Sequence, residues 1–340
     1  MKKKKNLLLA PFLLLLTALF SPTAAAIAPG EALIPGGQVI GIEMVCDGVL
    51  VSGFADVETA EGAVCPAKLA GICPGDRIVA LNGHAIHNGD DFLSAASELT
   101  GECVELTAVR NDNTLRFRVN PRQSTHGVWQ LGLWLRSGIR GIGTITFRDP
   151  ESGLYGALGH AVSLSEDGTP TAFEGGTIRR ADVTGVVPGE RGKPGELLGE
   201  SEPGRTAGTV DENTGSGIFG YSDETLVSGE ALPAAAADEM HLGKATILST
   251  IDPGGPREFA VEIVRICRSE GECRQLMLTV TDPELLAVTG GIVQGMSGSP
   301  ILQDGRIVGA VTHVLVSDPT KGYGISIGNM LETAERLAAA

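Results

Sequence analysis

The sequence predicts a mainly β protein of two domains that follow an apolar N-terminal segment. The chain has 340 residues, which is about the length of two average domains. Aromatic residues make up only 4% of it, and 47 glycines are spread along it. Short apolar runs between Gly, Pro and Asp turns recur from about residue 38 to residue 281. Many short strands with regular turns favour β sheets that close into barrels.

The net charge excludes one class of partner. The chain carries 41 acidic and 26 basic residues, a formal net charge of −15. An acidic surface repels phosphates, so we expect no nucleic-acid partner. The sequence has no long acidic tail, and the charge is therefore interpreted as a solvated surface.

Residues 1–30 are expected to be a signal peptide or a membrane anchor. Lys2–Lys5 precede an uncharged, mostly apolar stretch that continues to residue 30, and Ala24–Ala26 offers a cleavage site. The stretch is also long enough to span a bilayer, which needs roughly 20 residues, although Pro11 and Pro22 interrupt it. Because lysines that flank an apolar segment stay on the cytoplasmic side of the membrane, either alternative places the rest of the chain outside the cytoplasm.

A short Pro/Gly linker over 31–37 and a first domain over 38–121 are expected next. Strands are predicted over 39–44, 48–54, 77–81 and 103–109, and helices over 66–72 and 90–99. The run that starts at Pro66 and ends at Gly83 reads P-A-x-x-A-G-I-x-x-G-D-x-I-x-x-x-N-G. This run resembles bacterial PDZ domains.

The PDZ resemblance implies a peptide partner. Such domains add an extended peptide as a strand at a sheet edge and hold its terminal carboxylate with backbone N–H groups. Ile40-Gly41-Ile42 stands where the family keeps its carboxylate loop, so these three residues are predicted to bind the peptide. The alternative, that Ile40 and Ile42 pack in a β core, stays open.

The second domain is expected over 125–340. Predicted strands cover 139–147, 154–160, 178–187, 196–198, 206–210, 243–250, 259–266 and 275–281, which suggests a closed or nearly closed barrel. One helix is expected at the C-terminal end, capped by Asn329, with Leu331, Ala334 and Leu337 on one face.

Residues 295–300, Gly-Met-Ser-Gly-Ser-Pro, suit a turn that carries a nucleophile. Small neighbours let a carbonyl group approach Ser297, and the N–H groups of Gly295 and Ser297 can converge on a developing oxyanion. The G-x-S-G-x-P arrangement is that of chymotrypsin-like serine peptidases. A plain Gly/Ser turn between strands is the alternative, and Ser299 is the next candidate nucleophile.

A serine nucleophile requires a histidine and a carboxylate. His160 follows an apolar strand and a glycine and is the preferred base; His313 is its rival and is expected to line or support the pocket, and His241 is expected at the surface. Asp282 ends a strand and is predicted to orient the histidine. Asp149 and Asp318 both precede proline and are alternatives that suit ordinary turns.

Six cysteines are compatible with an exported protein. Cys267 and Cys273 would face each other across a hairpin, so a local disulfide is an option. The sequence has no paired C-x-x-C and no histidine close to these residues, which makes a zinc site less favoured than structural roles. We expect no metal and no cofactor.

Several long motifs together resemble the SpoIVB (stage IV sporulation protein B) serine peptidases. These motifs are Gly141–Phe147, Tyr155–His160, Thr281-Asp282, Gly290–Pro300, Gly309–Val314 and Asp318–Thr320. The resemblance implies His160 as general acid and base, Asp282 as orienting residue and Ser297 as nucleophile. It also implies an exported enzyme, acting around the developing forespore, that cleaves itself and a membrane-bound regulatory protein and so activates intramembrane processing of a sigma factor.

Other classes are less favoured. In HtrA-type peptidases the PDZ domain follows the catalytic domain, whereas here it precedes it. A catalytically silent PDZ scaffold remains the alternative function. A zinc peptidase is less favoured still, because the chain contains no H-E-x-x-H motif.

Overall fold

The computed structural model describes residues 31–110, 113–163, 170–171, 173–202, 204–267 and 274–339. The predicted signal or anchor segment, residues 1–30, lies outside the described residues. So does Cys273, and with it the predicted disulfide to Cys267. Within the described ranges, no helix is long and apolar enough to cross a membrane.

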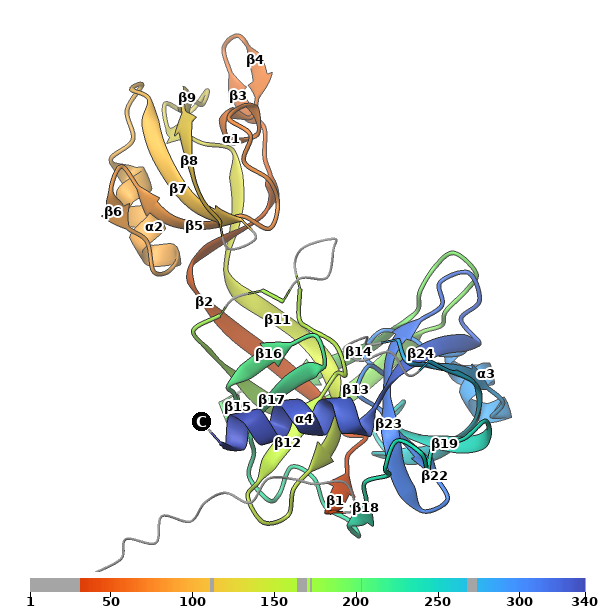
Figure 1. The fold of residues 1–340 in the computed structure, drawn as a ribbon. Helices are drawn as coiled ribbons and strands as arrows, with labels where there is room; N and C mark the ends of the chain where they lie inside the picture. The colour runs from red at the N-terminus through yellow and green to blue at the C-terminus, as the bar shows by residue number, and fades with distance from the viewer. Residues whose placement is uncertain are drawn as a thin grey trace, which may run out of the picture.

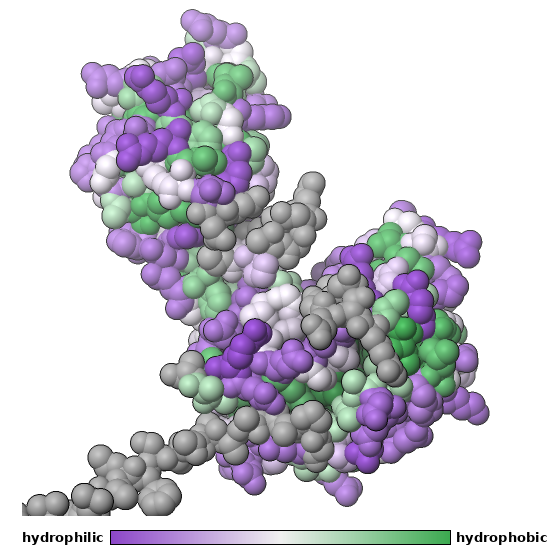
Figure 2. Space-filling model, in the orientation of Figure 1, coloured by the Kyte–Doolittle hydropathy of each residue, from purple (hydrophilic) through white to green (hydrophobic). Residues whose placement is uncertain are grey.

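The molecule is mainly β and forms two lobes (Figures 1 and 2). The smaller lobe has a hydrophobic core that extends from Val49 to Leu131. Its own elements are β3 (Val57–Thr59), β4 (Gly62–Val64), α1 (Pro66–Leu69), β5 (Arg77–Leu81), β6 (His84–Ala85), α2 (Gly89–Ser97), β7 (Val104–Arg110), β8 (Asn113–Val119), β9 (Arg122–Gln123) and β10 (Trp129–Gln130). Helix α2 buries Phe92, whereas Leu93 is 68% exposed.

Two strands of 16 residues each join the lobes, β2 (Val39–Phe54) and β11 (Leu133–Arg148) (Figure 1). They pair antiparallel from Leu133 opposite Phe54 to Thr144 opposite Val39. The predicted break between two strands, at residues 45–47, is therefore wrong. Gly48 has a φ of +120° and lies against the Ile78 carbonyl, so it changes the local geometry without ending the strand.

This pairing links residues on both sides of the boundaries predicted for the first domain. Residues 40–45 of β2 pair with β13 (Gly175–Val187) in the larger lobe, whereas β11, from the far end of the domain, adds its first residues to the sheet of the smaller lobe. The predicted boundaries at 38 and 121 both miss this exchange. Turn residues mark where a chain bends, but the partners of a long strand are chosen in tertiary structure.

The predicted linker over 31–37 is a strand instead. Residues Ala32–Pro35 form β1, which pairs with β11 and with β18 (Leu232–Pro233). Leu33 has no exposed surface and packs in a core with Phe147 and Phe219. Burial of that side chain outweighs the turn-forming tendency of the Pro/Gly residues around it.

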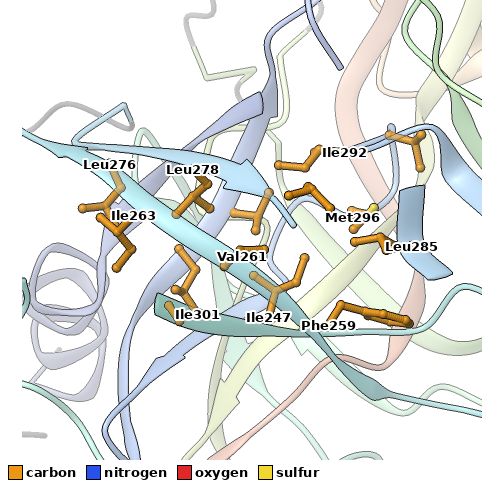
Figure 3. Close-up of a cluster of buried hydrophobic side chains, with 14 of the residues drawn as sticks. Ile247, Phe259, Val261, Ile263, Leu276, Leu278, Leu285, Ile292, Met296 and Ile301 are labelled. Carbon is orange, nitrogen blue, oxygen red and sulfur yellow. The ribbon is translucent and has the colours of Figure 1, made fainter. Parts of the chain in front are cut away.

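The larger lobe contains one closed barrel, of order β19-β20-β21-β24-β23-β22, beside a sheet shared with the smaller lobe. The barrel strands are β19 (Gly243–Ser249), β20 (Arg257–Ile266), β21 (Leu276–Val280), β22 (Pro300–Gln303), β23 (Arg306–Val314) and β24 (Lys321–Ser326). Side chains such as Ile247, Val261 and Leu278 alternate along these strands and fill the core (Figure 3). The predicted β-barrel domain is confirmed.

The remaining elements of the larger lobe complete the shared sheet and cover it. They are β12 (Leu154–Ala157), β14 (Glu196–Ser201), β15 (Gly208–Val210), β16 (Glu212–Thr214), β17 (Gly217–Tyr221), α3 (Pro283–Thr289) and α4 (Ile327–Ala338). The cap of α4 is Ser326, whose hydroxyl accepts from the Asn329 N–H, so the predicted cap at Asn329 is wrong by three residues. Leu331 and Ala334 are buried, as the predicted stripe requires.

Candidate active site

Ser297 lies on a turn between α3 and β22. The turn uses two glycines with positive φ, Gly295 at +94° and Gly298 at +99°, a conformation that other residues adopt only under strain. Ser297 itself is half-buried, and its hydroxyl donates to the Thr312 carbonyl at 2.7 Å. The serine is therefore held in place from β23 and must release that carbonyl before it gives up its proton.

His160 follows β12, where Leu158 and Gly159, both with φ of +69°, reverse the chain. Its Nδ1 lies 2.8 Å from the Ala161 carbonyl. A carbonyl only accepts, so this contact assigns the proton to Nδ1 and leaves Nε2 as a proton acceptor. Burial lowers the pKa of His160 below 6.5, and the bond to Ala161 opposes that shift. The imidazole is thus neutral at neutral pH, with Nε2 left to accept a proton as a general base requires.

His160 and Ser297 line the same pocket, which has a volume of about 570 Å³. The histidine comes from the shared sheet and the serine from the barrel, so the pocket lies between the two halves of the larger lobe. Its walls are mostly aliphatic, with Leu158, Val293 and Val314 among them. The sequence predicts that these two side chains come together, and the fold places both of them in one cavity.

His313 is the neighbour of His160 in this pocket. The two ring centroids are 4.8 Å apart and the planes are tilted by 39°. Burial, with the nearby His160 and Arg274, lowers the pKa of His313 to about 4. A group with that pKa is a weak base at neutral pH, which fits the expectation that His313 lines the pocket.

Gly295 and Ser297 both line this pocket, and each has a backbone N–H group on the turn. Neither N–H group donates a hydrogen bond to any group within the described ranges. Unbonded donors on a rigid turn beside a nucleophile are the arrangement that binds an oxyanion. The geometry is compatible with the role predicted for both residues.

The structure places Asp282 at the start of α3 and not among the residues that line the pocket of His160 and Ser297, and its assignment as the residue that orients His160 stays a prediction. Its carboxylate caps α3 by accepting from the N–H groups of Glu284 and Leu285, both at 3.0 Å, and it also accepts from the Ala260 N–H at 3.2 Å. These bonds lower its pKa, although its partial burial opposes the shift. The Asp-Pro sequence at a strand end is equally a helix start, and here it serves as one.

The other candidate side chains have structural roles. Asp149 closes a turn by accepting from the N–H groups of Glu151 and Ser152. Asp318 pairs with Lys321. His241 is exposed, as predicted, and lies 2.8 Å from Asp304.

Ser299, the alternative nucleophile, is fully buried. Its hydroxyl donates to that of Ser249 at 3.1 Å. A serine without exposed surface cannot meet a substrate.

The peptide-binding residues predicted in the PDZ part are also misplaced. Ile40, Gly41 and Ile42 pair with β11 on one edge and with β13 on the other, and both isoleucines are buried. No free edge is left there for an added strand. The alternative that Ile40 and Ile42 pack in a β core is the one that the structure supports.

The smaller lobe contains a different groove that the sequence analysis missed. A pocket of about 230 Å³ lies between Phe92, Ala96 and Leu99 on one side and residues 129–133 on the other. Residues 131–133 read Leu-Gly-Leu, the same apolar-Gly-apolar pattern as Ile40-Gly41-Ile42, and Gly132 has a φ of +76°. The pattern was therefore visible at two places, and only the fold shows which one adjoins α2.

In the part of the chain that the structure describes, no cluster of three or more His, Cys, Asp or Glu side chains could hold a metal ion. The cysteines at positions 46, 65, 73 and 103 are not joined in disulfides.

A serine on a turn with two positive-φ glycines, a neutral histidine that lines the same pocket and a closed β barrel fit a serine peptidase. A family model, SpoIVB peptidase S55, matches residues 127–331, and a PDZ domain model matches residues 59–110. The chain belongs to the SpoIVB peptidase S55 family.

Parts of the chain are similar to proteins whose structure or description is known. A putative zinc metalloprotease of Clostridium perfringens is 34% identical over 83 residues, and the chain spans about a quarter (25%) of that relative. The PDZ domain of an SdrC-like protein from Listeria monocytogenes is 21% identical, with a TM-score of 0.22, over 26% of this chain and 87% of that one. The inactive form of Rv3671c protease is 13% identical, with a TM-score of 0.36, over 58% of this chain and 85% of that one.

Proposed function

We propose that this protein is an exported serine endopeptidase of sporulation signalling that cleaves a membrane-associated regulatory protein and itself, and so activates intramembrane processing of a sigma factor. The observation that carries the peptidase activity is the pocket shared by His160 and Ser297. The lysine-rich, apolar N-terminus supports export and action at a membrane. Membership of the SpoIVB family supports the regulatory substrate.

In the proposed reaction His160 Nε2 takes the Ser297 proton, and the alkoxide attacks a peptide carbonyl. The N–H groups of Gly295 and Ser297 bind the oxyanion. His160 then protonates the leaving amine, and water repeats the cycle on the acyl-enzyme. The Ala161 carbonyl holds the imidazole tautomer, the role that a carboxylate has in a triad.

Labelling with a fluorophosphonate tests this function. We expect the wild-type protein to be modified at Ser297, with the site located by fragmentation of the peptide that contains residues 295–300, and its N-terminus to be shortened by self-cleavage. The Ser297→Ala variant is the control and should keep its full N-terminus apart from removal of a signal. Modification at Ser299 would indicate a different nucleophile, and no modification of a folded wild-type protein would favour the silent scaffold.

We also propose that the PDZ domain recognises the C-terminal segment of a protein in the groove between α2 and residues 129–133. The apolar walls suit the last side chain of a peptide. The Leu131-Gly132-Leu133 turn offers backbone groups for its carboxylate. Ala96 lines this groove, while the next residue, Ser97, is exposed outside it.

The groove proposal predicts a difference between two neighbouring substitutions. Ala96→Leu places extra methyl groups in the groove and should weaken peptide binding about tenfold or more, which corresponds to about 1.4 kcal/mol. Ser97→Leu adds the same side chain outside the groove and should change affinity little. Calorimetry with a panel of hexapeptides that end in apolar residues, each as free acid and as amide, measures both. Equal binding of acids and amides would contradict carboxylate recognition.

A further inference from the structure

Two threonines of β11, Thr144 and Thr146, are fully buried beside the turn that carries Ser297. Alternate residues of a strand share a face, and the residues between and after them, Ile145 and Phe147, fill hydrophobic cores on the other side. A buried hydroxyl costs free energy unless it is hydrogen-bonded. The partners of these two hydroxyls therefore show why threonine stands here.

Both hydroxyls donate to carbonyl groups of the nucleophile turn. Thr144 Oγ1 donates to the Gly295 carbonyl at 2.8 Å, and Thr146 Oγ1 donates to the Gly298 carbonyl at 2.8 Å. The backbone N–H of Thr144 donates to the Ser297 carbonyl at 3.0 Å. Two residues of one strand thus fix three carbonyl groups within four positions of the turn.

The carbonyl that accepts from the Thr144 hydroxyl belongs to the peptide group that stands between the two oxyanion donors along the chain. The peptide that contributes the Gly295 N–H is held through its Gln294 carbonyl, which accepts from Leu197 N–H at 2.8 Å. The peptide that contributes the Ser297 N–H is held through its Met296 carbonyl, which accepts from Ser299 N–H at 3.0 Å. The carbonyl of the peptide between them is held by the Thr144 hydroxyl, so rotation of that peptide would turn both donors away from a common point.

We propose that Thr144 and Thr146 are positioning residues that hold the oxyanion turn in its reactive conformation, with Thr144 the more important. This inference rests on the proposed peptidase function. Neither side chain has exposed surface, so neither touches substrate. They act through the N–H groups of Gly295 and Ser297, whose placement decides how strongly the transition state is bound.

Substitution by valine removes the hydroxyl and keeps the shape and the β-branch. Thr144→Val should lower the second-order rate of fluorophosphonate labelling about 10- to 100-fold, because a small displacement of a catalytic group has effects of that size. Thr146→Val should lower it less. Thr144→Ser keeps the hydroxyl and should recover the wild-type rate to within about threefold. In peptide hydrolysis the loss should fall on kcat rather than on KM.

Thr250→Val is a matched control within the same lobe. Thr250 is also buried, and its Oγ1 donates to a glycine carbonyl, that of Gly37, at 2.8 Å rather than to a carbonyl of the nucleophile turn. This variant should lose about as much thermal stability as Thr144→Val and keep the wild-type labelling rate. Equal labelling rates in both variants and the wild type would overturn the proposal.

Amide hydrogen exchange gives a readout that does not depend on activity. Thr144→Val should speed exchange at Met296 and Ser299, whose N–H groups bond within the turn, relative to Thr250→Val. Unchanged exchange at these amides would also overturn the proposal. A wild-type protein that exchanges as expected but does not react with the fluorophosphonate would count against the peptidase function and not against the role of Thr144 in the turn.

Discussion

Replacing His160 with alanine is expected to lower peptide hydrolysis by on the order of 10⁴- to 10⁶-fold, the size of effect that follows loss of the histidine in other serine peptidases. The imidazole has two consecutive tasks, removal of the Ser297 proton and protonation of the leaving amine. Burial lowers the pKa of His313, which makes that residue a weak base and a poor replacement. Steady-state hydrolysis of an unfolded protein substrate, with the folded state checked by circular dichroism, measures the loss.

The pH dependence of the wild-type enzyme belongs to the same prediction. The base must be neutral to accept a proton, and burial places the pKa of His160 below its ordinary value of 6.5. Activity should therefore persist as the pH falls through 6.5, and the acid limb of kcat/KM should have its midpoint below that value. A midpoint above 6.5 would mean that a carboxylate stabilises the imidazolium, contrary to the position of Asp282.

Asp282→Ala is the control that separates a helix cap from a catalytic carboxylate. Loss of the cap should cost about 1 kcal/mol of unfolding free energy, measured by urea denaturation, and should leave kcat within a few-fold of the wild type. A fall in kcat as large as that of His160→Ala would show that Asp282 moves to His160 during the reaction.

Replacing Gly298 with alanine is expected to disrupt the active site and the packing around it. A Cβ at this position would lie 1.9 Å from the Thr144 carbonyl oxygen and 2.6 Å from the Leu158 backbone nitrogen, so the clash involves backbone that cannot rotate away. The φ of +99° adds strain for any side chain. We expect a loss of about 3 kcal/mol or more in stability and a loss of about 100-fold or more in labelling rate.

Gly328→Ala provides the matched glycine control. Gly328 lies in the first turn of α4, and a Cβ there meets no atom within 4 Å. This variant should gain up to about 1 kcal/mol, because alanine loses less backbone entropy than glycine in a helix. Thermal melts compare the stability of Gly298→Ala with that of Gly328→Ala, and fluorophosphonate labelling compares their reaction rates. A Gly298→Ala protein as stable and reactive as the wild type would refute the assigned conformation of the turn.

The sequence by itself determined the order of the domains, most strand positions and the pair His160 and Ser297. Local signals carry this information, because turn glycines, apolar alternation and the G-x-S-G-x-P run are short patterns whose meaning depends little on distant residues. The family motifs added the function that we propose, which composition and periodicity alone do not contain.

Only the tertiary structure decided which strands pair and which side chains meet. Two places share the apolar-Gly-apolar pattern, and the one at residues 40–42 is enclosed by β11 and β13 while the one at residues 131–133 adjoins α2. Asp282 satisfies the sequence rule for a strand-end carboxylate and for a helix cap equally well, and its position beside α3 selects the cap. Long-range pairing encloses one copy of the motif between two strands and places the other beside a groove, and no local pattern records that choice.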